Sequence, residues 1–361
     1  MTSYDLLRRD EALYEGQEFY ACILDEAQAI KNHTTQKYKA VCKVRSRVRF
    51  ALTGTPVENR LGELWSIFSF LMPGYLPPYK SFCSRFEKPI VQEEDQTAVR
   101  RLNQLTGPFI LRRMKSDVLK ELPPKTENVY RIELEEEQRK LYLAAVVDAR
   151  EKLKAAKPED KMAVFAVLMR LREICCDPRL IADNWEGGSA KLDACAELVS
   201  SAVEGGHRIL LFSQFTSMLE LLAKRLDAEG ISHFTLQGST PKPVRAELVR
   251  RFNGGEVSVF LISLRAGGTG LNLTAADIVI HYDPWWNVAA QNQATDRAYR
   301  IGQQNPVQVY KLIAQDTIEE KIVELQQAKQ SLADTVTGTA DGAILSMRPD
   351  ELLQLLEGSE P

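Results

Sequence analysis

The chain has 361 residues, of which 44% are hydrophobic and 26% are charged, as in an ordinary globular protein with a sizeable core. This length predicts two or three domains. The net charge of −3 excludes a protein that is basic over its whole surface, although local basic patches remain compatible with it.

The compartment is indicated by the cysteines and by the absence of targeting segments in the sequence. None of the six cysteines forms a C-x-x-C pair, which favours reduced thiols in the cytoplasm. The first residues are charged and lack a signal-peptide core, and no apolar run reaches the about 18 residues of a membrane span. The four histidines do not cluster with cysteines, so we predict no zinc site.

The first half of the chain mixes strands and helices. Hydrophobic periodicity predicts strands at 19–25 and 47–53 and helices at 34–45 and 57–72. "PFILRR" (108–113) and "TENVYRIELE" (126–135) read as further strands, and long helices follow at about 135–157 and 160–176.

The second half alternates regularly after "DNWEGGSAK" (183–191), which reads as a domain boundary. Strands are predicted at 208–213, 233–237, 257–263, 277–283 and 306–314, and helices at 190–203, 215–229, 242–252, 287–300 and 349–357. Strands that alternate with helices indicate an α/β fold whose parallel sheet is covered on both faces.

The carboxyl ends of these strands carry the candidate chemistry, because sites in parallel sheets form there. Asp25 and Glu26 end the first strand, where one carboxylate suits Mg²⁺ and the other could polarise a water molecule. Two solvated acids at a helix start are the alternative. Thr53, Gly54 and Thr55 end the second strand and could sense a phosphate, or they could simply form a capped turn.

A third stretch, 291–304, places Arg297 and Arg300 three residues apart on a predicted helix, so both should point the same way. Paired guanidinium groups suit phosphate oxygens, and a solvated helix face is the alternative. Gly267, Gly268 and Gly270 follow a strand just upstream and allow a ligand to approach the backbone closely.

Six stretches then carry a resemblance to a known family. In chain order these are D-E-A-Q, L-T-G-T-P-x-E-N-R-L-x-E-L-W-S, F-S-Q-F, R-A-G-G-T-G-L-N-L-T-A-A-D, D-P-W-W-N and Q-A-T-D-R-A-Y-R-I-G-Q. They resemble the ordered motifs of the Swi/Snf-type ATPases of helicase superfamily two, in the style of the bacterial members. The resemblance runs from residue 1 to about 330 and implies RecA-like α/β lobes, ATP and Mg²⁺ as cofactors, and double-stranded DNA as partner.

The resemblance also implies roles for single residues. Asp25 would hold Mg²⁺, and Glu26 would orient the hydrolytic water. Gln28, Thr53, Gly54 and Thr55 would couple nucleotide state to movement, while Gly270 and Gln293 would lie near the nucleotide. Arg297 and Arg300 would be arginine fingers. Residues expected near DNA are Ser213, Gln214, Ser263, Arg265 and Trp286. For Trp285 and Trp286 the expectation is one side chain in the core and one at the DNA groove.

By resemblance, residues 1–79 form the C-terminal part of a first RecA-like lobe. Residues 80–185 would comprise a helical insertion, the last strands of that lobe and a linker. Residues 186–330 would form a complete second lobe, and 331–361 a tail.

One departure from the family concerns the phosphate loop. None of the 20 glycines is followed by lysine, so the sequence contains no match to the G-x-x-x-x-G-K-[ST] loop. The expectation is therefore the C-terminal portion of a DNA translocase of the bacterial cytoplasm and nucleoid. Its missing half-lobe would be supplied in cis or in trans, with RNA polymerase or other DNA-bound proteins as further candidate partners. A truncated or split product that only binds DNA or protein is the alternative.

Overall fold

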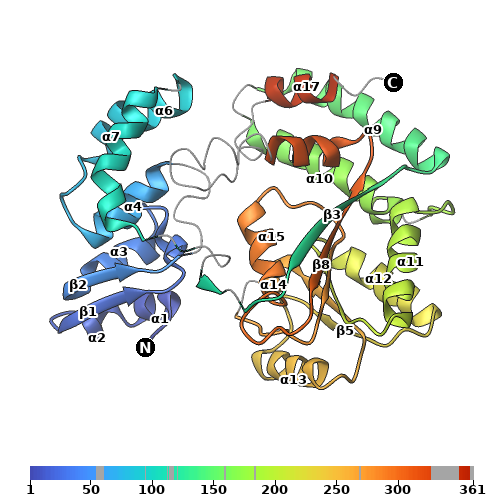
Figure 1. Cartoon of the computed structure of the whole chain (residues 1–361). Helices are drawn as coiled ribbons and strands as arrows, with labels where there is room; N and C mark the ends of the chain where they lie inside the picture. Colours follow the sequence, from blue (N-terminus) through green and yellow to red (C-terminus); the bar gives the residue numbers. More distant parts are fainter. Residues whose placement is uncertain are drawn as a thin grey trace. The chain divides into compact units, whose positions relative to one another are not determined.

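The computed structural model describes residues 1–53, 61–93, 95–111, 113, 118–119, 121–157, 160–182, 184–267, 270–326 and 349–357. These residues form two compact units (Figure 1). The first unit is built from residues 1–113, and the second from residues 114–325 together with the C-terminal helix. Among the described residues, no helix is long and apolar enough to cross a membrane.

The first unit contains a parallel pair of strands covered by helices. Its elements are α1 (Tyr4–Arg9), α2 (Glu11–Tyr14), β1 (Glu18–Leu24), η1 (Ala27–Ile30), α3 (Gln36–Lys43), β2 (Arg45–Ala51), α4 (Leu61–Leu71), α5 (Tyr79–Phe82), the π-helix η2 (Cys83–Glu87), α6 (Lys88–Gln92), α7 (Gln96–Thr106) and η3 (Gly107–Phe109).

Alternation along β1 and β2 decides which face of this pair is covered. Leu24 of β1 packs with Val41 of α3 and Phe70 of α4 in one core cluster. Helix α3 begins where the Thr35 hydroxyl accepts a hydrogen bond from the backbone N–H of Tyr38, as an N-cap should. A second cluster, around Leu64 and Phe82, joins α4 to the helices that follow it.

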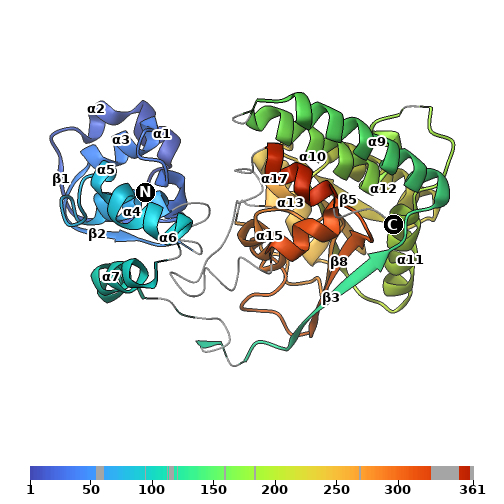
Figure 2. The same ribbon diagram turned by 90° about the horizontal axis from the view of Figure 1, so that it is seen from above.

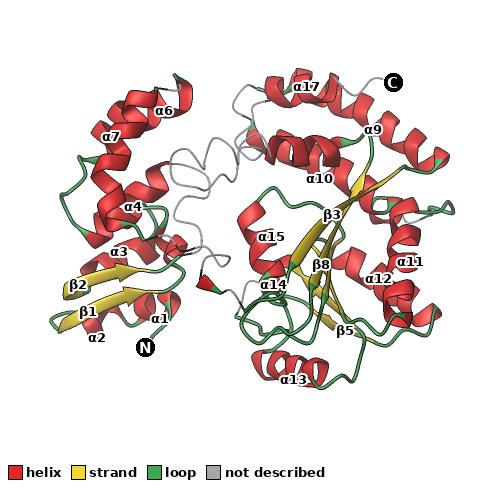
Figure 3. Ribbon diagram, viewed as in Figure 1, coloured by secondary structure: helices red, strands yellow, loops and turns green. Residues whose placement is uncertain are grey.

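The second unit is a six-stranded sheet with helices on both faces (Figure 3). Its elements are β3 (Lys125–Ile132), α9 (Glu136–Ala155), α10 (Lys161–Cys176), η4 (Pro178–Leu180), α11 (Ala190–Glu204), β4 (Ile209–Ser213), α12 (Thr216–Ala228), β5 (His233–Leu236), α13 (Lys242–Asn253), β6 (Val259–Ser263), α14 (Leu264–Gly267), β7 (Ile278–His281), α15 (Val288–Thr295), β8 (Val307–Ala314), a helical stretch at 318–326, and α17 (Pro349–Glu357).

The strand order is β3-β8-β7-β4-β6-β5, and every pair is parallel. The central strands β4, β6 and β7 are buried along their whole length, which explains why they are continuous apolar runs. Helices α11 and α12 cover one face of the sheet, and α13, α14 and α15 cover the other. A third cluster joins α9, α10 and α17.

Two predicted strands need correction. Residues 125–132 do not complete the first sheet but form β3, which lies beside β8 at the edge of the second sheet (Figure 1, Figure 2). The described residues of 108–113 contain no strand, and residues 107–109 form a short 3₁₀ helix. A lone strand pattern does not reveal its neighbour, because pairing in a parallel sheet is between residues far apart in the chain.

Candidate functional site

The carboxyl end of β1 holds the predicted acidic pair. Asp25 and Glu26 follow Leu24 directly, and both are exposed. The Tyr4 hydroxyl donates to the backbone carbonyl of Asp25 at 2.7 Å. Burial, followed by the charge of Asp25, raises the pKa of Tyr4 to about 12, so this hydroxyl remains a donor at neutral pH. Helix α1 thereby fixes the backbone of the acidic pair.

Glu26 has an unusual backbone and a defined side-chain partner. Its φ of 49° and ψ of 53° are left-handed, a conformation that costs about 1–3 kcal/mol for a residue other than glycine and often marks a functional site. Gln28 Nε2 donates to Glu26 Oε2 at 2.6 Å, and the Thr53 hydroxyl donates to Gln28 Oε1 at 2.8 Å. Three of the predicted residues therefore form one hydrogen-bond chain between the ends of β1 and β2. Gly54 and Thr55 lie outside the described residues.

The carboxylate oxygens at this strand end are suitable ligands for a hard cation. Asp25 Oδ1 accepts the Glu26 backbone N–H at 3.0 Å, and the exposed carboxylate can offer an oxygen to Mg²⁺. Mg²⁺ keeps several waters in protein sites, so a single carboxylate is a sufficient anchor. What the sequence lacks is the glycine-rich loop that would hold the phosphates.

In the second unit, the ends of β4 and β7 are joined by Asp283. The Ser213 hydroxyl donates to Asp283 Oδ1 at 2.6 Å, and the Gln214 backbone N–H donates to the same atom at 3.2 Å. Ser213 is fully buried. Ser263 at the end of β6 is 3% exposed and accepts the Ala266 N–H at 3.3 Å. Both hydroxyls have a partner within the second unit, and their expected position near DNA stays a prediction. The side chain of Arg265 is outside the described part of the chain.

Arg172, a residue that sequence reasoning missed, closes this cluster from α10. Its side chain is completely buried, and Nη2 donates to Asp283 Oδ2 at 3.2 Å and to the Pro284 carbonyl. Burial raises the pKa of Asp283, and Arg172 and Ser213 oppose that rise. The available signal was the position of Arg172 on the apolar face of α10, one residue after Leu171 and three before Cys175.

Trp286 is the inner member of the tryptophan pair, and its expected position beside DNA stays a prediction. It is 6% exposed, and its ring lies 4.6 Å from the Arg172 guanidinium and 5.9 Å from the ring of Phe165. Trp285 is only partly buried. The aromatic ring supports the buried guanidinium by a cation–π contact.

Arg297 and Arg300 lie after a helix rather than on one. Helix α15 begins at the cap Asn287, which accepts the Ala290 N–H at 2.7 Å, and ends at Thr295. Residues 296–300 form turns, so the expected helical spacing of the arginines is wrong. Arg297 is 7% exposed, whereas Arg300 is half-buried.

Both arginines nevertheless meet the loop that contains Gly270. The Arg297 carbonyl accepts the Leu273 N–H at 3.0 Å, and Arg300 Nη1 donates to the Leu271 carbonyl at 3.2 Å. Gly270 has φ of 51° and is exposed, with open space where a Cβ would lie. Gln293 is half-buried on α15. The second unit thus gathers its predicted glycine and arginines at one loop.

His281 anchors α15 to the sheet and was not predicted. Its Nε2 is 2.9 Å from the Thr295 hydroxyl, and its ring stacks on Phe212 with 5.7 Å between centroids. Burial, with a smaller effect from the Lys311 charge, lowers the pKa of His281 to about 3. The imidazole is therefore neutral, and it fixes the last residue of the helix from which the arginine turn departs.

Parallel sheets with their polar residues at the carboxyl ends of the strands place both units in the RecA-like class of α/β folds. Residues 1–180 match the SNF2-related domain, and residues 190–302 match the helicase conserved C-terminal domain. The chain belongs to the SNF2-related ATPase family. The predicted fold class and resemblance are confirmed.

Two solved structures and one relative illustrate the match. The SWI2/SNF2 ATPase core domain of Sulfolobus solfataricus is 36% identical, with 99% of this chain and 74% of that chain covered and a TM-score of 0.56. The same core in complex with dsDNA is 35% identical, with coverage of 93% and 72% and a TM-score of 0.53. A Mycoplasma pneumoniae protein named as an uncharacterized ATP-dependent helicase is 40% identical over 362 residues, which are 99% of this chain and 34% of the relative. The chain therefore spans about a third of that relative's length.

Proposed function

We propose that the chain is the C-terminal portion of an ATP-dependent translocase on double-stranded DNA, which hydrolyses ATP between two RecA-like lobes. In this proposal residues 1–79 belong to the first lobe and residues 186–330 to the second. The family match and the similarity to a SWI2/SNF2 core in complex with dsDNA support it. Translocation would use contacts to the phosphate backbone and would not read sequence.

The observation that carries the proposal is the hydrogen-bond chain from Thr53 through Gln28 to Glu26. In the proposed site Asp25 binds Mg²⁺, and Glu26 accepts a proton from the hydrolytic water and orients it. Gln28 fixes the Glu26 carboxylate and transmits its position to Thr53 at the end of β2. Bound ATP and Mg²⁺ would supply the phosphoryl group and the neutralisation of its charge.

The second unit would contribute positive charge to the same reaction. Gly270 would let the nucleotide approach the backbone, and Gln293 would lie close by. Arg297 and Arg300 would stabilise the charge that develops on the transferred phosphoryl group. Near the DNA backbone we propose Ser213, Gln214, Ser263 and Arg265. The Ser213 hydroxyl and the Gln214 N–H are held in place by Asp283.

One face of the β1–β2 pair supports the proposed half-lobe partner. In the parallel register Ala21 lies opposite Val48, and Ile23 lies opposite Phe50, so these four side chains share the face turned away from α3 and α4. Ile23 is 61% exposed and Phe50 is 53% exposed. Parallel strands are normally buried on both faces, and two strands alone make a marginal sheet. We infer that a polypeptide carrying a phosphate loop, in cis or in trans, adds strands and covers this face.

We also propose a cellular setting for this enzyme. The Mycoplasma pneumoniae relative and the cysteine pattern support a bacterial cytoplasm or nucleoid location. Besides duplex DNA, RNA polymerase and other DNA-bound proteins are the proposed partners of such a translocase.

The test is ATP hydrolysis with and without a phosphate loop. Without an added phosphate loop, the chain should hydrolyse ATP at background rates. It should bind duplex DNA weakly, with an affinity that falls as the salt concentration rises. Fusion to an N-terminal segment that carries a G-x-x-x-x-G-K-[ST] loop should restore DNA-stimulated hydrolysis. In the fusion, Glu26→Gln should abolish turnover, and Arg297→Ala or Arg300→Ala should lower it by roughly 10³-fold or more.

Two results would count against the proposal. The first is DNA-stimulated ATP turnover by the unfused chain that disappears in the Glu26→Gln variant, because it would show that no additional phosphate loop is needed. A fusion that folds and binds DNA but hydrolyses no ATP would favour the alternative, a split product that acts only as a binding module.

A further inference from the structure

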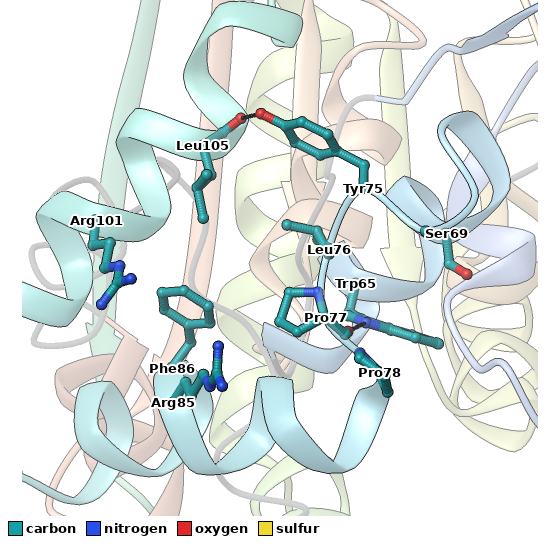
Figure 4. Close-up of a pocket in the computed structure, with 11 residues that line it drawn as sticks. Trp65, Ser69, Tyr75, Leu76, Pro77, Pro78, Arg85, Phe86, Arg101 and Leu105 are labelled. Carbon is teal, nitrogen blue, oxygen red and sulfur yellow. Dashed lines mark hydrogen bonds between the residues drawn. The ribbon is translucent and has the colours of Figure 1, made fainter.

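A pocket in the first unit lies apart from the carboxyl ends of β1 and β2. Its volume is about 580 Å³ (Figure 4). Helix α4, the turn that follows it, η2 and α7 all contribute to its walls, through Trp65, Ser69, Gly74–Pro78, Arg85, Phe86, Arg101 and Leu105. None of these residues belongs to the proposed nucleotide site.

The walls of this pocket are held together by contacts within the unit. Trp65 Nε1 donates to the Pro77 carbonyl at 2.8 Å, and the Tyr75 hydroxyl donates to the Leu105 carbonyl at 2.9 Å. Phe86 is 4% exposed and packs against Phe82 with 5.4 Å between ring centroids. The apolar floor is therefore preorganised, which lowers the entropic cost of binding.

Two cationic side chains enter the same pocket from different elements. Figure 4 shows Arg85 of η2 and Arg101 of α7 on either side of the Phe86 ring. Within the described part of the chain, neither guanidinium group has a hydrogen bond or an ion pair, and no acidic residue lines the pocket. The neighbouring Arg100 differs, because its Nε donates to the Gln96 carbonyl of its own helix.

This combination selects a ligand that is apolar at its centre and anionic at its edges. Planar guanidinium groups grip carboxylates in a bidentate manner, and the pocket wall of Leu76, Pro77 and Phe86 suits an apolar side chain. A DNA backbone would satisfy the arginines but would leave the apolar wall uncovered. A peptide segment can satisfy both.

The chain's own acidic, leucine-rich helix is not the occupant. Helix α17 packs in the second unit, where Leu352 and Leu356 are buried against α9 and α10. We propose that the pocket binds an acidic peptide segment of a separate partner protein. An apolar side chain of that peptide fills the pocket, and flanking carboxylates pair with Arg85 and Arg101.

The test uses the full chain and a fluorescently labelled short peptide in which a central phenylalanine is flanked on both sides by aspartate and glutamate. The peptide should bind, and replacement of its phenylalanine by serine should abolish binding. Arg85→Ala and Arg101→Ala should each weaken binding about tenfold, the scale of one hydrogen bond to a charged group. The matched control Arg100→Ala should leave affinity unchanged.

A local signal and a competition assay complete the design. Peptide binding should change the fluorescence of Trp65, and the change should be lost in Trp65→Phe. The arginine variants should keep the melting temperature of the parent, because both side chains are exposed. Absence of binding, binding that is insensitive to Arg85→Ala and Arg101→Ala, or displacement of the peptide from this pocket by single-stranded or duplex DNA would overturn the proposal.

Discussion

Lys191 and Glu319 form a buried ion pair that permits a quantitative test of the second unit. Both side chains are completely buried, and Lys191 Nζ donates to Glu319 Oε2. The same carboxylate oxygen accepts the Ala314 backbone N–H at 2.9 Å, at the end of β8. Burial alone would lower the pKa of Lys191, but the carboxylate of Glu319 beside it raises the pKa above its ordinary value.

Lys191→Met should destabilise the second unit by about 3–5 kcal/mol, because it leaves a buried carboxylate without its counter-ion. Glu319→Gln should be destabilising for the same reason, since it leaves the ammonium group uncompensated. The double variant removes both charges and keeps an oxygen for the Ala314 N–H. It should therefore be more stable than the sum of the two single losses predicts, with a coupling of about 2 kcal/mol.

The assay is urea unfolding followed by tryptophan fluorescence in a Trp65→Phe background. The remaining three tryptophans, Trp185, Trp285 and Trp286, all lie in the second unit, so the signal reports that unit alone. Lys140→Met is the control, because its exposed pairing with Glu136 should contribute less than about 1 kcal/mol. Additive effects of the two single variants, or a loss below about 1 kcal/mol for Lys191→Met, would refute the reasoning.

Three further predictions follow from other contacts. Burial would raise the pKa of Glu127, but Lys125 and Lys311 lower it to about 2. The ionised Glu127 therefore stabilises the fold above its unfolded pKa near 4.5. That stabilisation is lost as the pH falls from 4.5 through about 2. The side chain is 37% exposed, so Glu127→Gln should cost only about 1 kcal/mol at pH 7, and urea titrations should show this difference vanish in acid. Arg297→Ala should lower unfolding free energy by about 1–3 kcal/mol and Arg300→Ala by less than about 1, because only Arg297 is buried; equal losses in denaturant titrations would contradict this. Ile23→Asp and Phe50→Asp should leave the melting temperature of the 1–361 chain unchanged but should impair ATP hydrolysis by the phosphate-loop fusion. Val91→Asp, which also changes an exposed apolar side chain, should affect neither the melting temperature nor the hydrolysis.

Local patterns were sufficient for most elements of the second unit. The apolar runs ILLFS and VFLIS are strands in the structure, because a parallel sheet buried on both faces needs uninterrupted apolar side chains. The strand-end rule likewise placed Asp25, Glu26 and Thr53 after β1 and β2, at the edge of a parallel sheet where ligands bind. Assignment of roles to these residues came from the family resemblance, and those roles stay predictions.

Two errors share a physical cause, namely that partners far apart in sequence decide the outcome. The strand pattern of β3 was readable, but its pairing with β8 joins residues about 180 positions apart in the chain. Helix α15 ends at Thr295 because the following turn is held by the loop at 271–273, which helical periodicity does not register. The environment of Trp286 likewise comes from residues distant in the chain, since its ring contacts Phe165 and Arg172 of α10.

Contacts between distant residues also explain why the sequence analysis assigned α9 and α10 to an insertion and linker and not to the unit that contains the second sheet. Their polar residues make the connections: Gln138 Nε2 donates to the Ile174 carbonyl at 2.8 Å, and Arg172 reaches Asp283 at the end of β7. A buried arginine is costly unless its charge is compensated, so its position on an apolar helix face implies a carboxylate across the core. Asp283 is that carboxylate, and it also holds Ser213 and the Gln214 N–H. Arg172 of α10 and the ends of β4 and β7 therefore meet at one buried carboxylate, so a displacement of α10 should also displace the turn after β4.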